Sequence, residues 1–452
     1  MTDLPTTRRH AYHQTLTYKI FCARKNEGEA VRTTFAECME LIRGVQRLTA
    51  GMPQIVYLVG WQHTGHDAMY PDWSVVNPRL APGEDALVAL RRLMREARAH
   101  GATVSLHLNM DDAYPSSPLW DEYVRHDLLL RHRDGRVMDG DVWDGERCHW
   151  ICKSREWACG LASRRIDALC ALLPLGEQGT VHIDVFRPNP SPGHGTTWAD
   201  EERACRDIVA RWHHHGVDVT VEYLADPTLA DLHPMILHDQ RDEQQRLMLP
   251  PEVLCGGGAA WNCRESTVRD GAPAWWGGFC APAAGCRYPE AWGNSLDKDL
   301  AVRGPGFLRL AALPAELMRT TILWHHLNRQ RAVEQRHTTT SYEVRFDGGA
   351  HTHVQLANRH LTVHQAGRLL VDGADRCLPA PWVTGLAALA WHDAGGQRSW
   401  DLGDDWRAVR EILVSIRDAV DADTVFVIPC HDGVIGLELP PARLALLTPC
   451  AG

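Results

Sequence analysis

An alternation of short β-rich runs with amphipathic helical runs, between about residue 15 and residue 225, constrains the fold more than any other feature of this sequence. Strands that alternate with helices form repeated βα units around a parallel sheet. The run Gln54–Val59 is almost wholly apolar, as expected for a strand buried on both faces. The predicted strands are residues 15–22, 54–59, 102–108, 180–186 and 217–223.

The predicted helices lie between these strands. The clearest is Ala86–Ala97, where apolar residues recur at helical spacing, arginines occupy the other face, and Gly101 follows as a C-cap. Further helices are expected at residues 32–48, 156–173 and 199–212, and Thr197 with Asp200 could cap the last of them.

The last quarter of the chain has a different pattern. From Ser341 onward, period-two segments alternate with glycine turns, which is typical of antiparallel hairpins, and residues 424–428 and 434–439 continue this pattern as a pair. We therefore predict an α/β protein, in which a (β/α)8 TIM barrel over residues 1–339 precedes a C-terminal antiparallel β-sandwich over residues 340–452. Residues 307–332 are expected to be helical and to close the barrel, and residues 255–292 to form a loop region over its active-site face.

Composition argues against several classes of protein. Lys plus Arg number 47 against 57 Asp plus Glu, so a nucleic-acid-binding surface is not expected. No run reaches the roughly 18 apolar residues of a membrane span, and residues 1–21 do not resemble a secretory signal. We expect a cytoplasmic protein that binds no membrane.

The 14 cysteines are scattered along the chain, so we expect mostly buried free thiols rather than a disulfide framework. The close pairs Cys148/Cys152 and Cys280/Cys286 lack the paired spacing of a zinc site. We expect neither a cofactor nor a metal at the functional site.

Two predicted strands end in a carboxylate, Asp184 and Glu222. A β/α barrel keeps its catalytic groups at the carboxyl ends of its strands. Because neighbouring strands lie ~4.8 Å apart, these groups could approach the roughly 5–5.5 Å separation of a retaining glycosidase pair. The alternative is that both carboxylates form salt bridges or cap loops.

Other polar residues could line the same mouth. Side chains alternate along a strand, so His182 shares a face with Asp184, and His107 shares a face with Asn109. The loop at residues 60–67, which includes Gln62, offers hydrogen-bonding groups to a hydroxyl-rich ligand. The 17 Trp against 7 Phe add flat apolar faces that suit stacking on sugar rings as well as core packing.

Four stretches, residues 57–67, 103–109, 181–184 and 216–222, resemble glycoside hydrolase family 101, the endo-α-N-acetylgalactosaminidases. Residues 342–347 and 399–402 look like the sandwich domain of that family, so the likeness extends from about residue 15 to 445. The resemblance implies a (β/α)8 barrel followed by a β-sandwich. It also implies a retaining double displacement on α-linked N-acetylgalactosamine or Galβ1-3GalNAc.

The resemblance also implies roles for individual residues. Asp184 matches the nucleophile and Glu222 the general acid/base. The other matched positions are His66 and Asp67 in the sugar-binding loop, His107 and Asn109 in the pocket, and Trp143 or Trp150 as a stacking tryptophan.

Typical members of family 101 are large, secreted and multidomain, whereas this chain has the features of a catalytic core without a signal peptide. We therefore expect it to act on imported oligosaccharides, glycopeptides or small α-glycosides, in endo mode or in exo mode like the related family 129. One alternative is a retaining α-galactosidase-type enzyme that uses the same carboxylate pair. Another is an inactive carbohydrate-binding protein.

Overall fold

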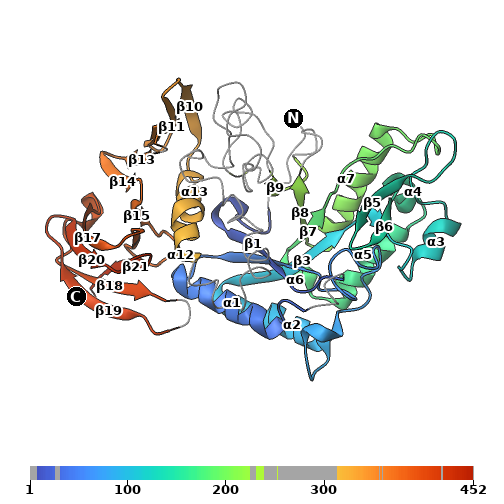
Figure 1. The fold of residues 1–452 in the computed structure, drawn as a ribbon, viewed down its shortest axis with the longest axis horizontal. Helices are drawn as coiled ribbons and strands as arrows, with labels where there is room; N and C mark the ends of the chain where they lie inside the picture. The colour runs from blue at the N-terminus through green and yellow to red at the C-terminus, as the bar shows by residue number, and fades with distance from the viewer. Residues whose placement is uncertain are drawn as a thin grey trace.

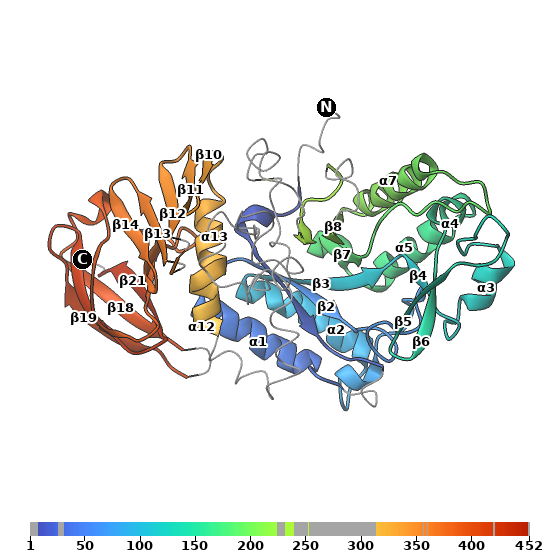
Figure 2. The ribbon, with the colours of Figure 1, turned by 45° about the horizontal axis from the view of Figure 1, so that its top comes forward.

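A computed structural model describes residues 8–25, 31–223, 231–238, 252, 313–355, 357–358, 360–418 and 421–450. Figures 1 and 2 show an α/β part formed by the first half of the chain and an antiparallel β part formed by its C-terminal residues. Helices α12 (Leu313–Glu316) and α13 (Ile322–Leu327) lie between the two parts. Within the described ranges, no helix is both long and apolar enough to cross a membrane.

The α/β part is built on a six-stranded sheet of order β1-β2-β3-β7-β8-β9, in which every neighbouring pair is parallel. All five predicted strands are present, whereas β9 contains only three residues and was not predicted. The strands are β1 (Leu16–Phe21), β2 (Gln54–Val59), β3 (Ala102–Asn109), β7 (Thr180–Asp184), β8 (Asp218–Tyr223) and β9 (Ile236–His238). Closure into eight strands, and the predicted loop region at 255–292, fall outside the described residues.

Two of the helices between these strands begin with a capping box. Helix α1 (Phe35–Leu48) has a capping box made by Thr34 and Glu37, and α7 (Trp198–His214) has the predicted one made by Thr197 and Asp200. Helix α2 spans Ala86–Glu96 and continues as a 3-10 turn to His100.

The single helix predicted at residues 156–173 is wrong. The structure has two helices there, α4 (Lys153–Ala158) and α5 (Leu161–Leu172). Gly160 separates them with φ 81°, a left-handed conformation that ends a helix and that glycine adopts without a steric penalty.

An inserted segment between β3 and α4 was also not predicted. It contains helix α3 (Trp120–Arg125) and a three-stranded antiparallel sheet of order β4-β6-β5. The strands are β4 (Asp112–Ala113), β5 (Asp139–Trp143) and β6 (Glu146–Trp150). Because β4 starts just after β3 ends, this small sheet stands at the carboxyl edge of the parallel sheet.

The predicted antiparallel region at the C-terminus is confirmed. Ten strands form one sheet of order β10-β11-β12-β13-β14-β15-β16-β21-β18-β19, and β17 pairs with β20. Buried residues of both sheets, including Trp400, Ile435 and Ile412, form one apolar cluster. The strands are β10 (Ala332–His337), β11 (Ser341–Phe346), β12 (Ala350–Gln355), β13 (His360–Gln365), β14 (Arg368–Asp372), β15 (Asp375–Pro379), β16 (Ala388–Trp391), β17 (Gly396–Asp401), β18 (Glu411–Arg417), β19 (Thr424–Pro429), β20 (Val434–Leu439) and β21 (Leu444–Pro449).

Two details of this region differ from the prediction. Strands β19 and β20 do not pair with each other, because β19 pairs with β18 and β20 with β17, so the residues between them lead from one sheet to the other. The helical run expected at 307–332 is described from Leu313 to Leu327 as α12, a π-helical turn and α13, and β10 then begins at Ala332.

The antiparallel part is anchored on the carboxyl end of α1. Arg417 donates hydrogen bonds from Nε and Nη2 to the carbonyl oxygen of Arg47, at 2.8 and 2.6 Å, and Trp382 Nε1 donates to the carbonyl of Thr49 at 2.7 Å. The last carbonyls of a helix have no partner within it, and a cation there also complements the helix dipole.

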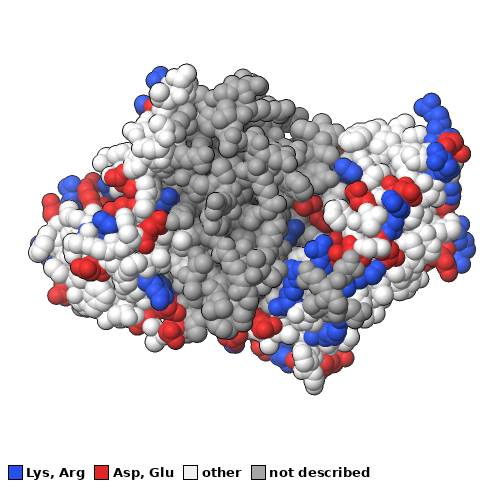
Figure 3. All heavy atoms as spheres, in the orientation of Figure 1, with Lys and Arg blue, Asp and Glu red and all other residues white. Residues whose placement is uncertain are grey.

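Side chains of both charge signs lie near one another on the described surface of Figure 3.

The end of β1 and the loop after β2 approach each other closely. The backbone N–H of His66 donates to the carbonyl of Ala23 at 2.9 Å, and Arg24 forms a parallel bridge with His66. Gly60 has φ +72°, and a Cβ atom there would lie 2.0 Å from the carbonyl oxygen of Ala23. Only glycine fits at this position without displacing backbone.

We therefore expect Gly60→Ala to destabilise the fold through a backbone clash. Gly83→Ala is the matched control, because Gly83 also has a positive φ but a Cβ there would meet nothing within 4 Å. The free energy of unfolding, measured in urea, should fall by about 1–3 kcal/mol more for Gly60→Ala than for Gly83→Ala. Equal losses would contradict the close approach.

Candidate active site

The paired register of β7 and β8 ends one residue before Asp184 and Glu222. His182 pairs with Thr220 and Ile183 with Val221, and the same register continued by one residue aligns the two carboxylates. The Nδ1 atom of His182 lies 2.9 Å from Oγ1 of Thr220, so these side chains share a face, and the side chains two residues further along project to that same face. Both carboxylates are partly exposed, whereas the strand residues before them are buried.

Three predicted histidines form a row beside Asp184. The ring centroids of His66 and His107 are 5.1 Å apart, and those of His107 and His182 are 5.5 Å apart. The Nε2 atom of His107 lies 3.4 Å from Oδ2 of Asp184. Burial lowers the pKa of His66 to about 3 and that of His107 well below its usual value. Both rings are therefore neutral at neutral pH, and the contact with Asp184 is not an ion pair.

Asp67 belongs to the same group of residues. His66 Nε2 lies 3.3 Å from Oδ2 of Asp67. Burial and, to a lesser extent, the nearby charge of Asp144 raise the pKa of Asp67 to about 7, although the guanidinium of Arg24 opposes the shift. Asp67 can therefore hold a proton near neutral pH, which lets it donate as well as accept hydrogen bonds.

Asn109 and Gln62 have positioning roles in the described structure. The Oδ1 atom of Asn109 accepts from the backbone N–H groups of Asp111 and Asp112, and its Nδ2 donates to Asp112 at 2.8 Å. Gln62 Nε2 donates to the carbonyl of Gly65 at 2.9 Å. These amides hold the turn after β3 and the loop after β2 in place.

A group of buried charged residues at the turn after β3 was not predicted from the sequence. It consists of Asp111, Asp112 and Lys153. Burial raises the pKa of Asp111 to about 6 and that of Asp112 to about 8. Lys153 is fully buried and forms an ion pair with Asp111. The signal was available, because Asp111 and Asp112 continue the polar run that starts at Asn109, directly after a predicted strand.

The hairpin of β5 and β6 reaches the rim of this site. Arg24 Nε lies 2.9 Å from Oδ1 of Asp144, and Lys25 forms an ion pair with Glu146. These pairs tie the hairpin tip to the end of β1. Trp143, next to Asp144, is 43% exposed, so it presents a free aromatic face at the rim.

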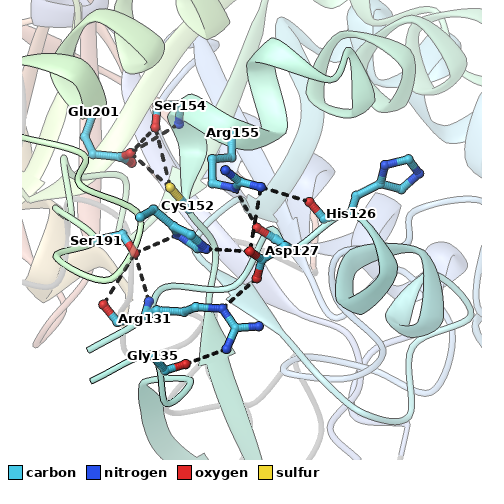
Figure 4. Close-up of polar contacts among 10 residues, drawn as sticks. His126, Asp127, Arg131, Gly135, Cys152, Ser154, Arg155, Ser191 and Glu201 are labelled. Carbon is cyan, nitrogen blue, oxygen red and sulfur yellow. Dashed lines mark hydrogen bonds and ion pairs between the residues drawn. The ribbon is translucent and has the colours of Figure 1, made fainter. Parts of the chain in front are cut away.

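The chain turns sharply after Asp184. Val185 has φ 46°, which is strained for a β-branched residue, and strain of this kind clusters at functional sites. The loop that follows is fixed further along by Ser191, whose Oγ accepts from the backbone N–H of Arg131 at 2.8 Å (Figure 4). The same figure shows Glu201 of α7 bonded to Ser154 at the start of α4, whose backbone N–H and hydroxyl both donate to Oε1 of Glu201. The Oε2 atom of Glu201 also accepts from the backbone N–H of Lys153 at 3.0 Å.

Comparison with protein families gives a match over this part of the molecule. Residues 11–226 match the sequence model of the family described as endo-α-N-acetylgalactosaminidase. This stretch matches the model of glycoside hydrolase family 101. The match covers β1 to β8 and every site residue discussed above, so the resemblance predicted from the sequence is confirmed over residues 11–226.

Comparison with solved structures gives matches at low sequence identity. The α-N-acetylgalactosaminidase NagBb from Bifidobacterium bifidum superposes with a TM-score of 0.54 as a quadruple mutant and 0.53 as its GalNAc complex, both at 14% identity. The match covers 78% of this chain and 57% or 58% of the NagBb chain, so the protein spans less than two thirds of that relative's length. The GH36 α-galactosidase AgaB from Geobacillus stearothermophilus matches at 12% identity, over 96% of this chain and 55% of its own, with a TM-score of 0.45.

The described cysteines agree with the sequence prediction. All ten are free thiols and seven of them are buried. Cys280 and Cys286 lie outside the described residues.

The raised pKa of Asp112 predicts a pH-dependent stability. The folded protein keeps this proton up to about pH 8, whereas the unfolded chain loses it near its ordinary pKa of about 3.9. The free energy of unfolding should therefore fall as pH rises through this window, and Asp112→Asn should remove that part of the fall. From about pH 5 to about pH 9 the melting temperature of Asp112→Asn should rise by a few degrees relative to wild type. Asp121→Asn, at an exposed position, is the control. If the difference in melting temperature between Asp112→Asn and wild type stays the same from about pH 5 to about pH 9, the raised pKa of Asp112 is contradicted.

Proposed function

We propose that the protein is a retaining glycosidase that cleaves α-linked N-acetylgalactosamine, alone or as Galβ1-3GalNAc, from glycans, glycopeptides or small glycosides. The observation that supports this most directly is that Asp184 and Glu222 each follow by one residue the last paired residues of two adjacent parallel strands, Ile183 and Val221, at the carboxyl edge of the sheet. The family 101 match supports the choice of sugar.

In the first step, an oxygen of Asp184 attacks the anomeric carbon while Glu222 donates a proton to the glycosidic oxygen. The bond from carbon to the leaving oxygen breaks, and a covalent glycosyl-Asp184 intermediate forms. Retaining enzymes hold these two groups about 5–5.5 Å apart, and neighbouring strands are separated by ~4.8 Å.

In the second step, Glu222 acts as the base. Glycosylation removes the negative charge of Asp184, which favours the ionised form of Glu222 nearby. Glu222 then takes a proton from water as that water attacks the anomeric carbon and releases Asp184. Two inversions at one carbon return the original configuration.

The remaining residues bind the sugar in this proposal. The neutral rings of His66 and His107 can each donate or accept a hydrogen bond with a hydroxyl group, and Asp67 lies beside them. His182 is stacked on His107 and orients it. Trp143 on the hairpin tip offers a stacking surface for a sugar ring.

Asp184→Asn should abolish turnover without loss of fold, because an amide is too weak a nucleophile to form the glycosyl intermediate. With an aryl α-N-acetylgalactosaminide, kcat/KM should fall by at least about 10⁴-fold. Asp218→Asn is the matched control, because Asp218 stands at the amino-terminal end of β8, where it accepts a hydrogen bond from the backbone of Arg9. Wild-type turnover by Asp184→Asn, with an unchanged melting temperature, would disprove its role.

Glu222→Ala should lose activity according to the leaving group. A loss of about 10²–10⁴-fold is expected on substrates with poor leaving groups and a smaller loss on activated aryl glycosides, which need no proton. Azide should restore part of the activity and give an α-glycosyl azide, because it attacks the intermediate without a base. A uniform loss with no azide effect would assign Glu222 a structural role instead.

The same assays distinguish the alternatives. An enzyme of the α-galactosidase type would prefer an aryl α-galactoside over its N-acetyl analogue, and an inactive binding protein would turn over neither. Release of the disaccharide from a Galβ1-3GalNAcα substrate would establish endo cleavage, and release of the monosaccharide from GalNAcα alone would establish exo cleavage.

A further inference from the structure

Three side chains at the site have the donor atoms of a metal centre. One ligand atom from each of His66, His107 and Asp184 lies within 4.8 Å of the others, the one such group found among the described residues. Two imidazoles and a carboxylate form the ligand set of several zinc sites that keep a fourth position open. Zn²⁺ holds such ligands at about 2.0–2.2 Å, which places neighbouring ligand atoms about 3.3 Å apart, so small side-chain rotations would complete the site.

The histidines at this site are buried and short of hydrogen-bond partners. His107 is 2% exposed, and neither of its ring nitrogens has a hydrogen-bond partner in the described structure. The Nδ1 atom of His66 is likewise buried without a partner there. The planes of the two rings meet at 71°, so the rings are not stacked and their lone pairs can converge on one point. A buried polar atom without a partner has free energy to gain from a ligand.

The surroundings of the three ligands also suit a cation. His66 Nε2 lies 3.3 Å from a carboxylate oxygen of Asp67, and a carboxylate behind a histidine commonly orients a metal ligand. The charged groups that act on the two imidazoles are the cations Lys19 and Arg24 and the anions Asp184 and Glu222. These two anions balance the two cations before any ion binds.

We propose that His66, His107 and Asp184 bind a divalent transition-metal ion of the Zn²⁺ class, and that the bound ion inhibits the enzyme. Inhibition follows because an oxygen of Asp184 that coordinates the ion cannot attack an anomeric carbon, and because the ion fills the space that the sugar would occupy. The ion is therefore an inhibitor and not a cofactor. This second part rests on the proposed role of Asp184, whereas metal binding itself does not.

The test is a calorimetric titration of the chelator-treated full-length protein with Zn²⁺, repeated with Co²⁺ so that visible absorption reports the ligand geometry. One equivalent should bind, and His107→Gln and His66→Gln should each weaken binding by more than about 100-fold. His66 lies in a loop, so its variant remains informative if His107→Gln is unstable. Mg²⁺ and Ca²⁺ should not compete, because they prefer oxygen ligands.

The matched control is a double variant, His351→Gln with His353→Gln. These partly exposed imidazoles flank Glu343 at 3.6 and 3.9 Å, and they represent a surface site for adventitious zinc. Their removal should leave the one-equivalent site unchanged. The proposal is wrong if the double variant loses the zinc site. It is also wrong if His66→Gln and His107→Gln bind zinc as tightly as the wild type does.

Activity distinguishes a failure of this inference from a failure of the proposed function. If both are correct, the Zn²⁺ concentration that halves turnover at substrate concentrations well below KM should equal the Kd from calorimetry, a chelator should reverse the effect, and N-acetylgalactosamine should compete with Zn²⁺. If turnover depends on Asp184 but Zn²⁺ does not bind, only the metal site is disproved. If Zn²⁺ binds through the two histidines while Asp184→Asn retains turnover, only the proposed function is disproved.

Discussion

The parallel hydrogen-bond register between β3, β7 and β8 is the constraint on which the site depends. It pairs Asn109 with Asp184 on one side and His182 with Thr220 on the other. Side chains alternate between the faces of a strand, so a slip of one residue would turn the carboxylates away from the histidines. Because backbone pairing fixes this register, the relative positions of Asp184 and Glu222 do not depend on the inserted hairpin or on the C-terminal strands.

Several acidic side chains lie wholly or partly buried close together at this end of the sheet, and the structure shows how the fold accommodates them. Ionised carboxylates are costly to bury without partners, and the protein limits this cost in two ways. Asp111 has a buried ion pair with Lys153, and Asp144 has a partly exposed one with Arg24. Asp67 and Asp112 instead keep their protons to higher pH, since burial raises their pKa values to about 7 and about 8. Acidic groups with different protonation states can therefore lie close together at one end of the sheet.

Periodicity predicted the regular elements well and the irregular ones poorly. The five strands and the capping box of α7 were predicted because each depends on residues next to one another in the chain. The hairpin of β5 and β6 was missed, since β5 is almost wholly exposed and its short sequence has no alternation of apolar residues to indicate a strand. The pairing of β19 and β20 was predicted wrongly because a strand pattern does not specify its partner.

The sequence by itself determined which residue types stand at the carboxyl ends of the strands, including Asp184 and Glu222, because strand alternation is a local property of the chain. Tertiary structure alone decided which of these side chains meet. It placed His66, from a loop, beside His107, and it used Asn109 and Gln62 to hold turns instead of leaving their amides free. It also set the protonation of Asp67 and Asp112, because desolvation depends on everything that packs around a group and not on its neighbours in sequence.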